Sequence, residues 1–331
     1  MSRLLQPTAF RRRCADRIAE PLLHWECLIP MGWEEWGDPP SPIRGDMALA
    51  HFRDHDSDAD VRVSASFVDR EVATPAWLAL VVAMSNERVV SLSALGYESP
   101  VDAVNTEAVV GETVIRRMTR AIRNGPWMLF VTVSAPREDF AARGGLLLAT
   151  ALSFRALQPS RHPAEPRTLH ALDGEPAITF LAPQSWTAPD PAAESPRRAR
   201  TRRTLLLKEA EATLGMLRVS VSNPGAVSPQ RALSALLGPM RQSGTRFEGV
   251  PIVACGPDAR WSQRFLAEVS GSHGEMLLTG YFHFLSSASG DVAVWSVSCS
   301  RDTHPVAWAL ARRAGEIAAM SATIIHPDGH D

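Results

Sequence analysis

The feature that most constrains the fold of this chain is a short motif that occurs twice. Residues 25–33 read WECLIPMGW, and residues 178–186 read ITFLAPQSW. In each case an apolar segment runs into a proline, two further residues and a tryptophan. Pro30 and Pro183 stand 153 residues apart. A match at this distance predicts that the chain holds two copies of one unit of roughly 150 residues.

Two strand-like matches follow in the same order. Arg62 opens the segment RVSAS and Arg218 opens RVSVS. Both alternate apolar and polar residues, as a strand with one buried face does. Further on, residues 127–133 correspond to residues 292–298, and an apolar-periodic segment follows each of them. Matches that keep one order along the chain favour a duplication over coincidence.

Helices are predicted at matching places in the two copies. Thr74 and Ser228 each precede a proline that opens an apolar-periodic segment. A hydroxyl at the N-cap accepts a backbone N–H, and proline is well tolerated at the first helical position. The helices predicted from these signals span 75–85 and 229–242. Longer closing helices are predicted over 138–155 and 305–323.

These patterns predict an α+β fold of two tandem repeats, each an antiparallel β-sheet packed with α-helices. Short polar connections between the strands favour antiparallel pairing. Late strands such as 127–133 are apolar on both faces, which predicts a sheet covered on both sides. The predicted organisation is an N-terminal segment (1–19), a first repeat (20–157), a proline-rich linker (158–176), a second repeat (177–325) and a tail (326–331).

Composition limits the classes of protein that the chain can represent. Of its 331 residues, 45% are hydrophobic and 21% are charged, and the net charge is −2. These values are typical of a globular protein whose net charge does not attract nucleic acid strongly. The N-terminus lacks a signal-peptide pattern and no apolar run is long enough to span a bilayer, so a cytoplasmic protein is expected.

The cysteines and one acidic segment are candidate sites. Cys14, Cys27, Cys255 and Cys299 form no CxxC pair and are expected to be reduced, with a single disulfide as the open alternative. The acidic run 54–60 has Ala59 and Ala65 where a calcium loop of the EF-hand type needs glycine and glutamate. A solvated hairpin tip is therefore expected there, with no metal and no other cofactor.

No motif for nucleophilic, nucleotide-dependent or metal-dependent catalysis occurs, and no catalytic residue is assigned. Ser270 and His273 stand close in sequence, but a Gly- and Ser-rich loop before a strand explains them better than a catalytic pair. His283 is expected to be half-buried in a sheet. His304, which precedes a proline, is expected beside a helix start.

Two further groups have both a functional and a structural interpretation. The run from Arg197 to Arg203 contains five arginines and could contact an anionic partner, although a solvated loop is the favoured interpretation. Trp33, Trp36 and Trp186 are expected to anchor the core rather than to form a ligand cage.

The order of elements, with the Pro-x-x-Trp opening at Pro30 to Trp33 and again at Pro183 to Trp186, resembles the PsbP/DcrB-like superfamily. That resemblance implies an α/β/α sandwich in each copy. Within the superfamily, the chain looks most like the Eag-type chaperone-adaptors of type VI secretion, which shield hydrophobic segments of secreted effectors as pairs. It differs from them by being a tandem. No ligand-contacting residue is carried over from this resemblance.

The function expected from these observations is binding of another protein, since the apolar sheet surface is abundant and no catalytic set is present. The leading hypothesis is a non-enzymatic cytoplasmic chaperone or adaptor, whose partner is another protein such as a hydrophobic segment of a secreted effector. No nucleic-acid partner is expected. A structural subunit of a secretion or envelope assembly and an enzyme with an unrecognised site between the repeats are the alternatives.

Overall fold

The structure is a computed structural model of the chain. It describes residues 10–16, 18–37, 47–85, 87–93, 102–189, 200–210, 212–249 and 251–325. Backbone contacts divide the chain into two compact units. The first comprises Met1–Asp69 and Ala73–Ala164, and the second comprises Arg70–Val72 and Glu165–Asp331. Each unit is described below by itself.

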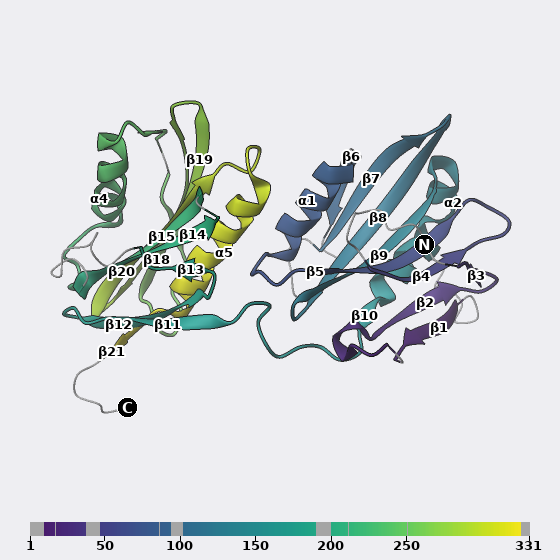
Figure 1. The fold of residues 1–331 in the computed structure, drawn as a ribbon, viewed down its shortest axis with the longest axis horizontal. Helices are drawn as coiled ribbons and strands as arrows, with labels where there is room; N and C mark the ends of the chain where they lie inside the picture. Colours follow the sequence, from purple (N-terminus) through teal and green to yellow (C-terminus); the bar gives the residue numbers. More distant parts are fainter. Residues whose placement is uncertain are drawn as a thin grey trace. The chain divides into compact units, whose positions relative to one another are not determined.

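The first unit is built on a seven-stranded antiparallel sheet with the order β3-β4-β5-β9-β8-β7-β6 (Figure 1). Its strands are β3 (Glu34–Glu35), β4 (Met47–Arg53), β5 (Asp60–Phe67), β6 (Arg88–Ser93), β7 (Ala103–Val110), β8 (Thr113–Asn124) and β9 (Trp127–Pro136). A smaller sheet combines β1 (Phe10–Ala15), β2 (Trp25–Pro30) and β10 (Arg155–Ala156). Its helices are the short 3-10 helix η2 (Pro21–Leu23), α1 (Thr74–Ser85) and α2 (Arg137–Ser153).

The second unit repeats this plan in the order β13-β14-β15-β20-β19-β18-β16, with β17 beside β18. Its large sheet contains β13 (Trp186–Thr187), β14 (Arg202–Glu209), β15 (Ala212–Ser222), β16 (Arg246–Phe247), β17 (Val253–Cys255), β18 (Gln263–His273), β19 (Met276–Ser287) and β20 (Gly290–Cys299). The small sheet contains β11 (Arg167–Leu172), β12 (Ala177–Pro183) and β21 (Thr323–Ile325). Its long helices are α4 (Pro229–Gln242) and α5 (Pro305–Ser321).

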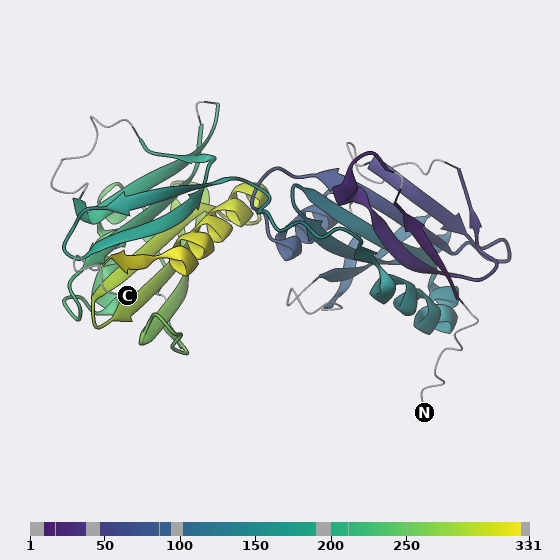
Figure 2. The ribbon, with the colours of Figure 1, turned by 90° about the horizontal axis from the view of Figure 1, so that it is seen from below.

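The two units place corresponding segments at corresponding positions, so the α+β tandem predicted from the repeated motif is confirmed. In each unit the segment ending in Pro-x-x-Trp is the central strand of the small sheet. In each unit one helix covers one face of the large sheet and the closing helix covers the other (Figures 1 and 2). The predicted sheet with two covered faces is therefore present in both.

The strand ladders refine the match between the late strands. Arg62 lies opposite Thr132 in the first unit, and Arg218 lies opposite Trp295 in the second. If the two arginines are equivalent, Thr132 corresponds to Trp295. The match read along the sequence instead paired Thr132 with Val297, two residues further on. A shift of two residues leaves every side chain on the same face, because strand side chains alternate with a period of two. For this reason the apolar pattern alone did not detect it.

The segments expected at the domain boundaries contain strands. β11 lies within 158–176, where a linker was expected, and β1 lies within the expected N-terminal segment 1–19. Both pair antiparallel with the strand that leads into Pro-x-x-Trp. Prolines in 158–176 suggested irregular chain, but they stand outside β11 itself. The predicted tail, 326–331, lies outside the described residues.

An apolar core of the first unit lies between its large sheet, α2 and the small sheet. It includes Trp25 and Ile29 of β2, Val61 and Val63 of β5, and Leu147 of α2. In the second unit, an apolar cluster fills the space between the sheet and α4 and includes Leu233, Phe282 and Trp295. None of the described helices has the length and apolarity that crossing a membrane requires.

Candidate functional site: an apolar sheet edge in the first unit

Strand β6 forms the outer edge of the first unit's large sheet. Within the described part of the chain it pairs only with β7, antiparallel, and the ladder shifts register between Val89 and Ser91. Five of its six residues are exposed to solvent. The backbone groups on its outer side therefore lie at an edge where another strand can add.

Apolar side chains are exposed along this edge. Val89, Val90 and Leu92 of β6 are exposed, Leu92 to 60%. At the end of the neighbouring strand, Val109 is 76% exposed and Val110 is also exposed. We call these five residues the β6 edge patch. Single exposed apolar residues are ordinary on protein surfaces, but a group of them on an open edge strand marks an interaction site or an aggregation hazard.

Helix α1 adds apolar surface on the same side of the unit. Its sequence, TPAWLALVVAMS, contains no charged residue. It contacts β7 and β8. Leu78 and Val82 are buried, whereas Trp77, Leu80 and Val81 remain partly exposed. A helix that is apolar all round is typical of one covered on more than one side.

The sheet face beneath α1 carries polar side chains as well as apolar ones. Thr119 and Thr132 lie on that face, and their hydroxyls are 3.0 Å apart in a hydrogen bond. Arg117 and Thr106 lie on the same face and both donate to the carboxylate of Glu87. Val104 pairs with Thr119, and Phe130 stands two residues before Thr132, so both lie on this face too, and both are buried. The helix therefore covers a face of mixed polarity and still keeps partly exposed apolar side chains.

Charged pairs hold the patch in place. Arg88 donates to Glu107 over 2.6 Å, across the β6–β7 pair. The Arg88 guanidinium, assisted by Arg137, holds the pKa of Glu107 below its usual 4.5 and outweighs the opposing effect of burial. Ionised at neutral pH, this pair supports the start of β6 without covering Val89 or Leu92.

The residues singled out from the sequence do not meet at this site. Asp54 and Asp60, at the two ends of the acidic run, are buried, which corrects the expected solvated tip; Asp56 and Asp58 are exposed as expected. Asp54 pairs with Arg143 of α2. Among the described residues, no group of three or more His, Cys, Asp or Glu side chains could hold a metal ion.

The histidines of the second unit have structural surroundings. His283 is half-buried on β19, and burial is the main cause that lowers its pKa from 6.5. His304 is itself the N-cap of α5, where its Nδ1 accepts from the Ala307 N–H at 3.2 Å. Ser270 and His273 lie within β18, not in a loop before a strand; the chain turns at Gly274, which has a positive φ of 59°.

The other predictions have mixed outcomes. Trp33 and Trp186 are buried in the core, but Trp36 is exposed, with Arg53 stacked 5.4 Å from its ring centre. Residues 197–199 of the arginine run lie outside the described part of the chain, whereas Arg202 and Arg203 belong to β14 instead of a loop. The four cysteines are free thiols, and burial raises the pKa of Cys27 to about 11.

Sequence reasoning missed the β6 edge patch. The segment RVVSLS is short and mixed, and no counterpart in the second copy drew attention to it. The uncharged sequence of residues 74–85 could have indicated an interaction surface, because a helix that is apolar on all sides is typically buried on more than one side.

Comparisons with known proteins concern the fold. No family model and no curated protein sequence matches the chain. Solved structures similar to it include the cyanobacterial PsbP protein CyanoP from Synechocystis, 17% identical, which covers 45% of this chain and 92% of its own, with a TM-score of 0.34. The Ran-binding protein Mog1p of Saccharomyces cerevisiae is 11% identical, covers 48% of this chain and 96% of its own, and has a TM-score of 0.33.

A third similar structure extends over both units. The immunity protein TplEi of the type VI secretion system of Pseudomonas aeruginosa is 11% identical and covers 96% of this chain and 98% of its own, with a TM-score of 0.25. These identities are too low to transfer a site or an activity. The finer likeness to Eag-type adaptors stays a prediction.

Proposed function

We propose that this chain is a non-enzymatic protein that binds another polypeptide along β6, as an added strand of the first unit's sheet. The open, apolar edge at β6 carries the proposal. Natural sheets protect such edges with charges, prolines, bulges or very short strands. The second unit uses very short strands, since its corresponding edge consists of β16 and β17. Strand β6 has an irregular register at Val89 to Ser91, but it is six residues long and exposes Val89, Val90 and Leu92.

The chemistry of the partner follows from the strand. An added strand forms backbone hydrogen bonds with the outer side of β6. Every second side chain of that strand then contacts the exposed apolar residues on one face of the sheet. The preferred partner is an extended segment with apolar residues at every second position. A hydrophobic segment of a secreted effector in the cytoplasm is the specific version of this proposal, with the chain as its chaperone or adaptor.

The test begins with co-expression of the full chain with the product of each neighbouring gene. A stable complex in size-exclusion chromatography is expected with at least one product. On binding, backbone amides of residues 88–93 should gain protection in hydrogen exchange, because the added strand pairs with them. Recovery of only the free chain with every neighbour would overturn the proposal.

A charge placed on the edge separates strand addition from other modes of binding. Leu92→Lys should weaken the complex at least about tenfold, because a lysine on an edge strand opposes pairing. Leu169→Lys is the matched control. Leu169 lies on β11, another edge strand, and is 64% exposed against 60% for Leu92. Equal binding by the two variants would show that the partner uses a different surface.

A further inference from the structure

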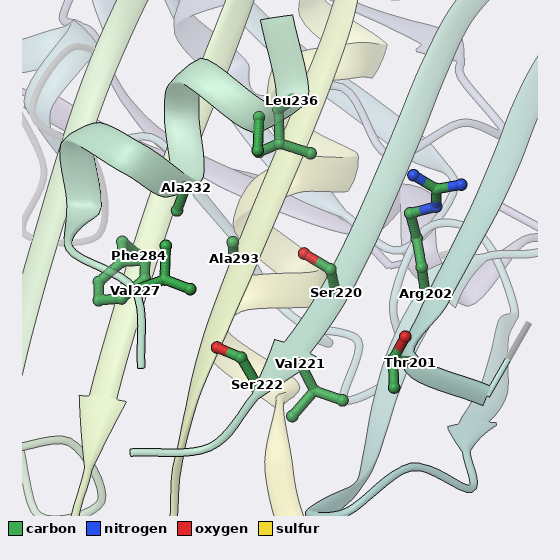
Figure 3. A pocket seen from close by; sticks show the side chains of 11 residues that line it. Thr201, Arg202, Ser220, Val221, Ser222, Val227, Ala232, Leu236, Phe284 and Ala293 are labelled. Carbon is green, nitrogen blue, oxygen red and sulfur yellow. The ribbon is translucent and has the colours of Figure 1, made fainter. Parts of the chain in front are cut away.

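A pocket of about 270 Å³ lies in the second unit, between α4 and the strands β14 and β15. Figure 3 shows its lining. One wall consists of α4, and the opposite wall consists of β14 and β15. Phe284 of β19 and Ala293 of β20 complete it. The pocket does not involve the β6 edge patch.

The strand register explains why the two walls differ in chemistry. Ser220 lies opposite Arg202 on β14 and opposite Ala293 on β20, so these three side chains share the sheet face that α4 covers. Close to α4 the lining is apolar, since Phe284 and Ala293 of the sheet and Ala232 and Leu236 of the helix are all buried. Away from α4 it is polar, and the hydroxyls of Ser220 and Ser222 point toward the space beside the helix (Figure 3).

Arg202 is the cationic group of this pocket. Its Nε is buried and has no hydrogen-bond partner among the described residues. The guanidinium supplies positive charge to the lining of the pocket, and a carboxylate is the group that pairs most strongly with it. The lining residues that the structure describes include no aspartate or glutamate. The nearby Asp291 is buried and already accepts hydrogen bonds from the Gly225 N–H and the Ser286 hydroxyl.

We propose that this pocket binds a small anionic amphiphile, namely a carboxylic acid with a medium-length aliphatic chain. The carboxylate would accept from Arg202 and from the hydroxyls of Ser220 or Ser222. The aliphatic chain would lie along Ala232, Leu236 and Phe284. The volume lies near the lower limit of small-molecule sites, which favours a short chain over a long lipid.

Calorimetric titration of the full chain with octanoate tests the proposal. Binding of octanoate is expected, together with affinities at least about tenfold weaker for octanol, which lacks the charge, and for acetate, which lacks the chain. Octylammonium should not bind, because it carries the wrong charge beside Arg202. Equal affinity for octanoate and octanol would overturn the assignment of an anion site.

Variants locate the binding. Arg202→Gln should reduce octanoate affinity about tenfold or more and leave octanol unaffected. Ala235→Phe should block both ligands, and Ala235 is exposed at the mouth of the pocket, so the larger side chain need not disturb the core. Arg231→Gln is the control, an exposed arginine of α4 that does not line the pocket. Octanoate binding that survives Ala235→Phe would place the site elsewhere and overturn the proposal.

Discussion

The two units share one topology but fill the same positions with different chemistry. Asp60 lies opposite Ser134 in the first unit, and Met216 lies opposite Val297 at the corresponding place in the second. The face beneath α1 mixes hydroxyls and charges with apolar side chains such as Phe130, whereas an apolar cluster around Trp295 fills the space beneath α4. The same strand order therefore accepts helix-covered faces of different polarity.

The difference determines where each unit keeps unused apolar surface. Helix α4 buries Ala232, Leu233, Leu236 and Leu237 and turns polar residues such as Arg231 to solvent. Helix α1 has no charged residue to turn outward, and side chains such as Trp77 and Leu80 stay partly exposed. The first unit therefore keeps exposed apolar surface at β6, whereas the second has an apolar pocket at the margin of α4.

The largest effect is expected from a substitution at Gly280 of β19, which packs against a buried tryptophan. Gly280 faces Trp295, and a Cβ added at Gly280 would lie 2.0 Å from the indole ring. Gly280→Ala should destabilise the second unit by roughly 3 kcal/mol or more, since the buried ring has no room to move. Urea titration followed by hydrogen exchange can report each unit separately, which is needed because a two-unit chain need not unfold in one step.

The control for this variant lies in the same unit. A Cβ at Gly238 of α4 would meet no atom within 4 Å, so Gly238→Ala should leave the second unit as stable or slightly more stable. Peptides of the first unit should exchange at the same rate in both variants. Loss of protection in both units after Gly280→Ala would contradict the description of two units with separate cores.

An intermediate effect is expected from the buried carboxylate of the first unit. Burial alone would raise the pKa of Asp60, but the nearby His51 ring, the Arg62 guanidinium and the Ser134 hydroxyl outweigh it, so its pKa lies below 3.8. His51 Nε2 is 3.5 Å from the carboxylate and Arg62 is 2.8 Å from it. Asp60→Asn should cost about 2 kcal/mol at pH 7, because charge-assisted hydrogen bonds are lost.

The sign of the pH dependence follows from the lowered pKa. A carboxylate whose pKa is lower in the folded state stabilises the fold above its unfolded pKa of about 3.9 and loses that contribution as the pH falls further. The difference between wild type and Asp60→Asn should therefore shrink below about pH 4. Asp58→Asn is the control, since Asp58 pairs with Arg53 at the surface and should matter little. A penalty for Asp60→Asn that is the same at pH 7 and pH 3 would refute the electrostatic explanation.

Much of the fold could be predicted from the sequence because its signals are local. Ser228 caps α4 by accepting from the Arg231 N–H, and the helix has the bounds that the Ser-Pro signal predicts. The burial of Asp60 could not be predicted, because Ser134, its partner across the sheet, lies 74 residues away in sequence. The β6 edge was also beyond prediction, since an open edge results from the order of all the strands.

The smallest effect concerns how closely the closing helix α5 approaches the sheet of the second unit. A Cβ at Gly315 of α5 would lie 2.6 Å from the Ser296 hydroxyl oxygen on β20, whereas one at Gly145 of α2 would meet nothing within 4 Å. Gly315→Ala should cost about 1–2 kcal/mol by pushing the helix from the sheet. Gly145→Ala should stabilise the first unit by about 0.5–1 kcal/mol, because alanine favours a helix. Both are measurable as shifts of the urea midpoint of the affected unit. Gly145 is exposed, so its substitution measures helix propensity without a contact to the sheet and serves as the control. A loss of stability for Gly315→Ala beside a gain for Gly145→Ala would show that α5 needs its glycine for close packing on β20, and equal signs would contradict this.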